Sequence, residues 1–264
     1  MKAYCLLRQD PWYRRQVFVD GLKACGHEVL LRRPDAMSKD TILLIWNRYA
    51  AVHELALQAE RAGATVIVAE NGYLGYEGVS PKFDVHPQGP KPGSFYSLSL
   101  GWHNGRGRWH VGEWNRFPAL GVTIKPWRTK EGYQLVCPNR SFGVGEQLMH
   151  PDWAARKESS LRKAGFLVKV RVHPGNNQPR NPLSADLEGA SGVHIWSSSS
   201  GVHALLEGIP VFCDAPYWIM KEAAANSKPQ VDRHVAFERL AWAQWTCEEI
   251  ASGEPFRHLL SATR

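Results

Sequence analysis

The sequence has no paired cysteines and no long apolar run, and each absence narrows the class of protein. Its five cysteines are widely scattered, and none belongs to a Cys-x-x-Cys pair. Neither a cysteine-ligated zinc site nor a disulfide framework is therefore indicated. No segment approaches the roughly 18 continuous apolar residues of a membrane-spanning helix. The first residues also carry no apolar signal segment, so we expect a cytoplasmic protein that is made without export.

Acidic residues are in deficit. The chain has 25 Asp and Glu against 32 Lys and Arg, a formal net charge of +7 over 264 residues. Such an excess raises the local concentration of polyanions, so nucleic acid, an anionic membrane and phosphorylated substrates are all compatible partners. The alternative is that the charge only keeps the protein soluble. The length is sufficient for two α/β lobes, each with its own core.

Strand-like and helix-like segments alternate over the first seventy residues or so. The first helix is expected to begin at Pro11, after the capping residue Asp10, and to end at Gly26. Alternation of this kind predicts a parallel sheet with crossover helices. The expected strands are Ala3–Leu7, His27–Leu31, Thr41–Trp46 and Ala64–Ala69, and a second helix is expected over Arg48–Ala62.

The regular pattern stops between Gly72 and about Arg128, where irregular loops with a few short strands are expected. It then resumes, and Arg233–Ile250 is expected to close the chain as one long amphipathic helix. The predicted fold class is α/β, with two Rossmann-like lobes, residues 1–128 and 129–264, facing a cleft. Later strands are expected at Tyr133–Cys137, Phe166–Val172, Val193–Trp196 and Ile209–Phe212, and helices at Asp152–Ala164, Leu183–Glu188 and Val202–Glu207.

The most informative segment is a strand that runs into four serines and a glycine and then into a helix. The serines are Ser197, Ser198, Ser199 and Ser200, and Gly201 follows them. Free N–H groups at a helix start, beside small hydroxyl side chains, suit a phosphate or diphosphate. Gly201 would let the backbone approach such a ligand closely. A cap that only satisfies the helix end is the competing interpretation, but four serines exceed what capping needs.

This order of strand, Ser-Ser-Gly, helix and Gly208-Ile209-Pro210-Val211 resembles the sugar-nucleotide domain of GT-B glycosyltransferases. It is similar above all to the capsule polysaccharide transferase type and to bacteriophage-encoded glycosyltransferases of DNA bases. Arg171-Val172-His173-Pro174 is similar to their Arg-x-His-Pro element, and Glu70-Asn71-Gly72-Tyr73 to their Glu-x-Gly-Tyr element. The resemblance implies a GT-B-like fold and a nucleotide-sugar co-substrate, with a UDP-sugar favoured. Where many GT-B enzymes hold the ribose with glutamate, this chain has His203, and Glu207 follows one turn later.

Further donor-site candidates lie where strands of the second lobe end. Arg140 and Ser141 belong to a glycine-containing turn after one strand, and Arg171 and His173 end another. Arg140 or Arg171 would neutralise the departing diphosphate, which a metal does in other transferases. His173 is also a catalytic candidate, and its alternative is a loop histidine that orders the turn at Pro174. Asp-x-Asp is absent, so we expect neither a metal nor another required cofactor.

Transfer with inversion needs a base that takes the proton from the acceptor hydroxyl. Glu70 is the first candidate, because it ends an apolar strand where desolvation would raise its pKa. A buried structural carboxylate bonded to loop amides is the alternative. His103 and Asp84 are the substitutes, although the turn that holds His103 is equally compatible with an ordinary exposed turn.

The segment from Trp102 to Lys130 combines positive charge with tryptophan. Cations for phosphates beside aromatic faces for bases are typical of nucleic-acid surfaces, and such a surface would help to extrude a base. The competing interpretation is that the tryptophans are core and the arginines solvated. The basic residues are Arg106, Arg108, Arg116, Lys125, Arg128 and Lys130, against one acid, Glu113. The acceptor-site candidates are Tyr73, Trp102, Asn104, Arg106, Arg108 and Trp109.

Residues and resemblance together leave three hypotheses. The favoured one, which rests on the resemblance to phage proteins, is sugar transfer to a hydroxymethylated pyrimidine in DNA. Its partners are a nucleotide sugar and DNA, with no membrane partner, in the host cytoplasm if a phage encodes the protein. The second keeps the enzyme but makes a capsule or lipid-linked glycan the acceptor. The third is a non-catalytic DNA-binding protein with a degenerate fold. The sequence does not set the oligomeric state.

Overall fold

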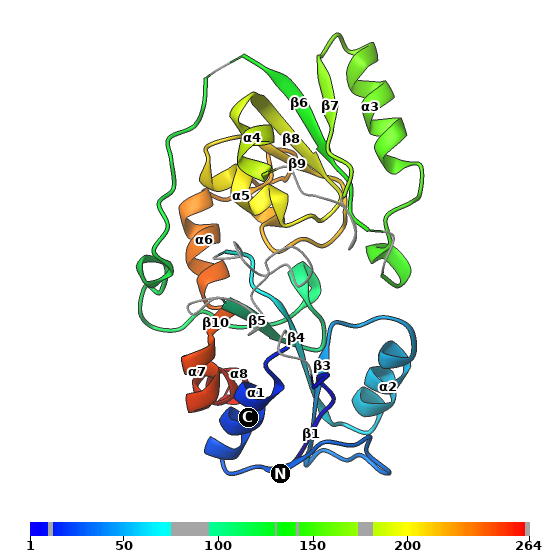
Figure 1. The fold of residues 1–264 in the computed structure, drawn as a ribbon, viewed down its shortest axis with the longest axis vertical. Coiled ribbons are helices and arrows are strands. Elements are labelled where there is room, and N and C mark those ends of the chain that lie inside the picture. The colour runs from blue at the N-terminus through cyan, green and yellow to red at the C-terminus, as the bar shows by residue number, and fades with distance from the viewer. Residues whose placement is uncertain (10–12, 75–94, 130, 141–142, 174–181, 262–264) are drawn as a thin grey trace. The chain divides into compact units, whose positions relative to one another are not determined.

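The computed structural model describes residues 1–9, 13–74, 95–129, 131–140, 143–173 and 182–261. The chain forms two compact units, one of Met1–Arg116 with Ala241–Arg264 and one of Phe117–Leu240 (Figure 1). This division differs from the expected one at residue 128. The Lys125 and Arg128 N–H groups donate to backbone carbonyls of Leu206 and Gly208, both at 2.8 Å, so this stretch belongs with the second unit.

A six-stranded sheet forms the centre of the first unit, in the order β10-β5-β4-β3-β1-β2. The four strands from the start of the chain are parallel, whereas β5 pairs antiparallel with β4 and β10 pairs antiparallel with β5. The central strand β3 is an unbroken apolar run buried on both faces, which is typical of parallel sheets. The strands are β1 (Lys2–Cys5), β2 (Glu28–Leu30), β3 (Thr41–Trp46), β4 (Thr65–Asn71), β5 (Phe95–Leu100) and β10 (Gln244–Thr246).

Helices cover both faces of this sheet. Phe18 of α1, Ile250 of α7 and Phe256 of α8 are fully buried in one core cluster, and Ala56 and Ala59 of α2 belong to another. Alternate residues of the strands point into the two clusters, as the pleat requires. The helices are α1 (Arg15–Ala24), α2 (Ala50–Arg61), α7 (Cys247–Ser252) and α8 (Glu254–Ser261), with a 3₁₀ turn η1 at Asn104–Arg106. Asp10 and Pro11, expected to start α1, lie outside the described residues.

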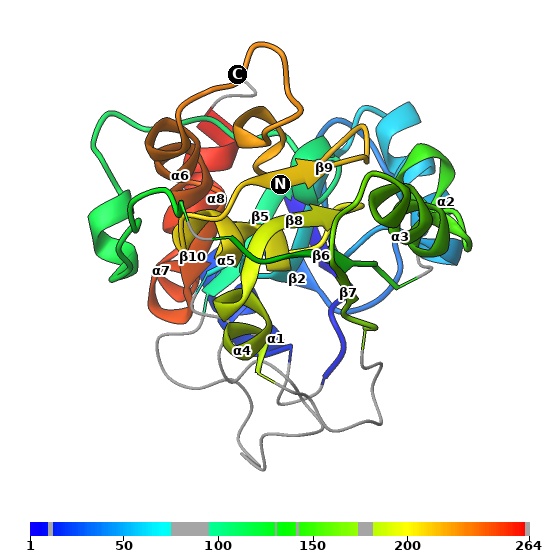
Figure 2. The same ribbon diagram turned by 90° about the horizontal axis from the view of Figure 1, so that it is seen from above.

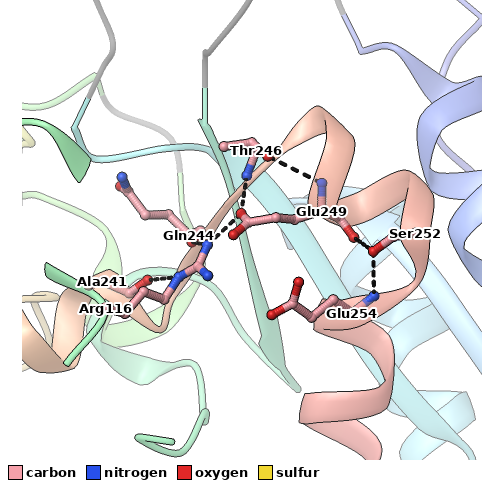
Figure 3. A network of polar contacts seen from close by, with 7 residues as sticks. All are labelled: Arg116, Ala241, Gln244, Thr246, Glu249, Ser252 and Glu254. Atoms are coloured by element: carbon pink, nitrogen blue, oxygen red, sulfur yellow. Dashed lines mark hydrogen bonds and ion pairs between the residues drawn. The ribbon is translucent and has the colours of Figure 1, made fainter. Parts of the chain in front are cut away.

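The expected single closing helix over Arg233–Ile250 is wrong. Helix α6 ends at Ala241, and α7 begins only after β10. The cause is a capping box in which the Thr246 hydroxyl accepts the Glu249 N–H at 3.2 Å and Glu249 accepts the Thr246 N–H at 2.7 Å (Figure 3). The spacing of Thr246 and Glu249 is the Thr-x-x-Glu pattern that starts a new helix, and this pattern is present in the sequence.

The second unit contains a four-stranded parallel sheet in the order β7-β6-β8-β9, whose strands lie side by side in Figure 2. Its strands are β6 (Tyr133–Cys137), β7 (Val168–Val170), β8 (Ala190–Ile195) and β9 (Val211–Cys213). Its helices are α3 (Trp153–Lys163), α4 (Leu183–Glu188), α5 (Ser200–Leu206) and α6 (Arg233–Ala241), with 3₁₀ turns η2 (Phe117–Leu120), η3 (Gly145–Gln147) and η4 (Lys221–Ala223). The predicted α/β fold with two Rossmann-like lobes is confirmed.

Candidate functional site

Four loops meet at one edge of the second sheet, where its parallel strands end. Asn139 and Arg140 follow β6, His173 follows β7, Ser197 follows β8 and Asp214 follows β9. Because the four strands run in one direction, their carboxyl ends share this edge. Open parallel sheets bind their ligands there. The structure therefore brings together donor-site residues predicted from separate motifs.

The serine loop, defined as Ser197–Gly201, joins β8 to α5. Ser200 donates its N–H and its hydroxyl to the Ser198 hydroxyl, at 3.3 and 2.9 Å, and the Gly201 N–H reaches the Ser198 carbonyl at 3.2 Å. The first N–H groups of α5 are thus already used. Within the described residues, the N–H groups of Ser198 and Ser199 have no acceptor, and Ser199 is exposed. The N–H groups that could bind an anion therefore lie just before the first residue of α5 and not within the helix.

The structure gives Gly201 a packing role and Glu207 an ion-pairing role. A Cβ at Gly201 would lie 2.7 Å from side-chain atoms of both Ile195 and Trp218, so glycine is required there for packing. Glu207 lies at the opposite end of α5 from the serine loop. It forms ion pairs with Lys125 and Arg128, at 2.7 and 3.0 Å. It therefore does not replace the missing ribose glutamate, and His203 stays half-buried at that position.

The two arginines predicted to bind the donor, Arg140 and Arg171, have different partners. Arg140 donates from Nε to Nδ1 of His173 at 3.3 Å, so two candidates from neighbouring strands meet. Arg171 forms an ion pair with Asp186 of α4, which also binds Lys169 at 2.6 Å. Burial alone would raise the pKa of Asp186, but the bonds from Lys169 and Arg171 lower it. Part of the Arg171 charge is therefore compensated internally.

Four residues of the predictions, Ser141, Pro174, Lys130 and Asp84, lie outside the described residues.

Glu70 is the last residue but one of β4 in the first unit, in register with Ser97 of β5. Its alternation with Val66 and Val68 places it on the face that α2 covers. Its Oε1 accepts the Asn71 N–H at 3.0 Å, and the Asn47 side chain also bonds to it. Burial raises the pKa of Glu70 to about 7 despite these hydrogen bonds, so the carboxyl titrates near neutral pH, as its strand-end position predicted.

Tyr73 lies close enough to Glu70 to feel its charge, and His103 is a neighbour in sequence of Asn104, which binds Tyr73. The Tyr73 hydroxyl accepts the Asn104 N–H at 3.1 Å and also bonds to Ser97. Burial raises the pKa of Tyr73, and the nearby Glu70 charge acts in the same direction. Burial, and after it the charge of Arg48, lower the pKa of His103 to about 4. His103 is therefore neutral, and its buried Nδ1 has no partner among the described residues.

Trp102, predicted to bind the acceptor, is half-buried and contacts two of the protein's own cations. The guanidinium groups of Arg106 and Arg48 stack on its ring, 3.8 and 4.3 Å from the centroid. Arg48 is only 1% exposed and also forms two bonds to Glu60, at 2.5 and 2.6 Å. The ring is therefore covered by the protein's own cations, and Arg106 is committed to it.

The basic stretch from residue 102 to 130 is not one charged surface. Arg116 is buried, donates to the Ala241 carbonyl at 3.0 Å and pairs with Glu249 (Figure 3). Lys125 and Arg128 belong to the other unit and pair with Glu207. Arg108 is exposed, and Trp109 packs against the core. Most of these cations stabilise the fold, which removes much of the support for a nucleic-acid surface.

The described residues show neither a metal cluster nor a membrane-spanning helix. Across the part of the chain that the structure describes, no group of three or more His, Cys, Asp or Glu side chains could hold a metal ion. No helix among the described residues has the length and apolarity needed to cross a bilayer.

Comparison with known proteins gives likeness in fold. No family model and no curated protein matches the sequence. A solved chain of Thermosulfurimonas dismutans KpsC, described as a beta Kdo 2,4 transferase, superposes with a TM-score of 0.58 and 13% identity over 92% of this chain and 90% of that one. A KpsC chain described as a beta Kdo 2,7 transferase superposes with a TM-score of 0.51 and 12% sequence identity. The match covers 100% of this chain and 99% of that one. This chain thus shares the fold of two sugar transferases, and likeness to DNA-modifying enzymes is not shown.

Proposed function

We propose that this chain is a glycosyltransferase that moves a sugar from a nucleotide-sugar donor to a hydroxyl of a glycan acceptor. In this proposal the loops Asn139–Arg140 and Ser197–Gly201 hold the donor, and Glu70 is the base for the acceptor. The likeness in fold to two chains described as Kdo transferases extends over nine-tenths of the chain or more, which supports the general activity.

The observation that carries the proposal is the raised pKa of Glu70. A general base works best when its pKa lies near the working pH, and burial raises the pKa of this carboxyl to about 7. The ionised Glu70 accepts the proton of the acceptor hydroxyl as the oxygen bonds to the sugar. The Nδ1 of neutral His103 is buried and has no partner among the described residues, so we assign the base to Glu70 alone.

Donor binding is assigned to the loops at the carboxyl edge of the second sheet. Arg140 supplies positive charge for the leaving phosphate, and His173 accepts a hydrogen bond from Arg140. The N–H groups of Ser198 and Ser199 supply hydrogen bonds to phosphate oxygens. Hydrogen bonds to a charged group are roughly twice as strong as neutral ones, so this set can stabilise a departing nucleotide.

A glycan acceptor is favoured over DNA. The DNA hypothesis depended on the cations and tryptophans of residues 102–130, and the structure uses Arg116, Lys125 and Arg128 in ion pairs. The two structural neighbours are described as Kdo transferases, and Kdo is a glycan sugar. The family resemblance favours a UDP-sugar as the donor, and a nucleotide-activated Kdo joins the candidates because these neighbours are described as Kdo transferases.

A thermal-shift screen followed by turnover tests the proposal. The screen uses UDP, GDP, CMP, ADP and their sugars, and a ligand at 100 times its dissociation constant adds about 2.7 kcal/mol to the folded state. The nucleotide sugar that shifts Tm is then incubated with Kdo-containing oligosaccharides or with 5-hydroxymethylpyrimidine DNA, and products are weighed by mass spectrometry. A mass gain on a glycan supports the proposal. A mass gain on DNA alone would show that the acceptor is DNA and not a glycan. The absence of a Tm shift with any nucleotide would contradict the proposed glycosyltransferase activity.

A further inference from the structure

Asn139 binds the serine loop through both atoms of its side-chain amide. Its Oδ1 accepts the Ser197 N–H at 3.0 Å, and its Nδ2 donates to the Ser197 hydroxyl at 3.0 Å. Asn139 follows β6, and Ser197 follows the neighbouring strand β8. Its own N–H donates to Met149 Sδ at 3.4 Å. Two hydrogen bonds from a planar amide fix both the position and the orientation of the residue that starts the loop.

A second contact from the same strand holds the other end of the loop. The Cys137 thiol bonds to the Ser200 hydroxyl, which in turn donates to the Ser198 hydroxyl at 2.9 Å. Ser197 and Ser200 are therefore both fixed from β6. Between them, Ser198 and Ser199 keep backbone N–H groups that have no acceptor in the described part of the chain.

We propose that Asn139 is a positioning residue for the donor phosphate, and that the N–H groups of Ser198 and Ser199 are the phosphate donors that it presents. This inference rests on the proposed function and names how that site is held. Asn139 itself does not touch the sugar. It fixes the backbone at Ser197, so that the next two N–H groups are oriented before the ligand arrives, and preorganised donors bind an anion without the cost of ordering a loop.

The chain offers a matched control in the same unit. Asn226 makes the same kind of paired contact with the end of β9, because its Oδ1 accepts the Cys213 N–H at 3.0 Å and its Nδ2 donates to the Cys213 carbonyl at 2.9 Å. Its side chain bonds to Cys213 and not to the serine loop. Loss of either amide removes two hydrogen bonds, and only the loss at Asn139 releases the serine loop.

Calorimetric titration with UDP, CMP, GDP and ADP, in wild type, Asn139→Ala and Asn226→Ala, tests the proposal. Both variants should lower Tm by a few degrees. Asn139→Ala should raise the Kd of the nucleotide that wild type binds by about tenfold or more, which is the loss of about one good hydrogen bond to a charged group. Asn226→Ala should leave that Kd within about twofold. Equal Kd values for the two variants would overturn the role of Asn139.

Asn139→Asp serves where the alanine variant does not fold. Aspartate can still accept the Ser197 N–H and hydroxyl, but it places a negative charge beside the phosphate. The affinity loss should be graded, larger for the nucleoside diphosphate than for the monophosphate and absent for the nucleoside, and it should shrink as salt screens the charge. A loss that is equal for all three ligands would contradict the proposal. A wild type that binds no nucleotide in the panel overturns the proposed function itself, and the inference with it.

Discussion

Replacing Glu70 with glutamine should stabilise the protein above neutral pH, because the ionised carboxylate is the form that burial disfavours. Burial raises the pKa of Glu70 from 4.5 to about 7. Between these values the unfolded chain has released a proton that the folded chain keeps, so wild-type stability falls as the pH rises through this range. The penalty is about 1 kcal/mol at pH 5 and levels off at about 3 kcal/mol by pH 8.5, at 1.36 kcal/mol per pKa unit.

The assay is urea unfolding of wild type and Glu70→Gln at pH 5 and pH 8.5. Glutamine keeps one oxygen for the Asn71 N–H and never ionises, so the variant should gain about 1 kcal/mol at pH 5 and about 3 kcal/mol at pH 8.5. Glu207→Gln is the control with the opposite sign. Burial would raise the pKa of Glu207, but Lys125 and Arg128 lower it, so this variant should lose stability at pH 8.5 and lose less at acid pH. Equal gains by Glu70→Gln at both pH values would refute the reasoning.

Two further substitutions test how the fold holds its charges and turns. Glu60→Ala should cost about 3 kcal/mol, measured by urea unfolding, because it leaves Arg48, which is 1% exposed, with a buried and partly uncompensated charge. A loss below about 0.5 kcal/mol, which is normal for a surface site, would contradict this. Gly208→Ala should cost more than Gly121→Ala, since both have a positive φ but a Cβ at Gly208 would lie 1.9 Å from the Pro126 carbonyl. Equal losses in Tm for the two variants would contradict this, because they would show that the backbone near Pro126 moves to accept the added Cβ.

The sequence predicted most of the fold, because local patterns determine most of it. The apolar run of β3 and the spacing of α4 were read at the residues where the structure places them. The prediction for the closing segment was wrong, because the apolar spacing of Arg233–Ile250 resembles one helix, whereas the capping box at Thr246 starts a new one. Strand β5 was absorbed into an irregular stretch, although all six of its residues are buried.

The site was predictable where it depends on strand ends and not where it depends on distant partners. The raised pKa of Glu70 was predictable, because a carboxyl at the end of an apolar strand is desolvated. The basic residues were misjudged, because sequence does not show which cations are paired. Arg116 meets Glu249 at a separation of 133 residues, and Lys125 meets Glu207 across 82. The contact of Asn139 was not predictable for a similar reason, since its partner Ser197 is 58 residues away.

Sugar transfer by wild type and by Glu70→Gln, followed as nucleotide release with the donor and glycan acceptor found in the screen, tests the central claim most directly. Wild-type turnover should rise as the pH passes through about 7, where Glu70 ionises. The variant should lose at least about 100-fold in kcat, the lower end of what a general base contributes, while its donor Kd stays within about twofold. Unchanged turnover in the variant, or a wild type that transfers no sugar, would contradict the account.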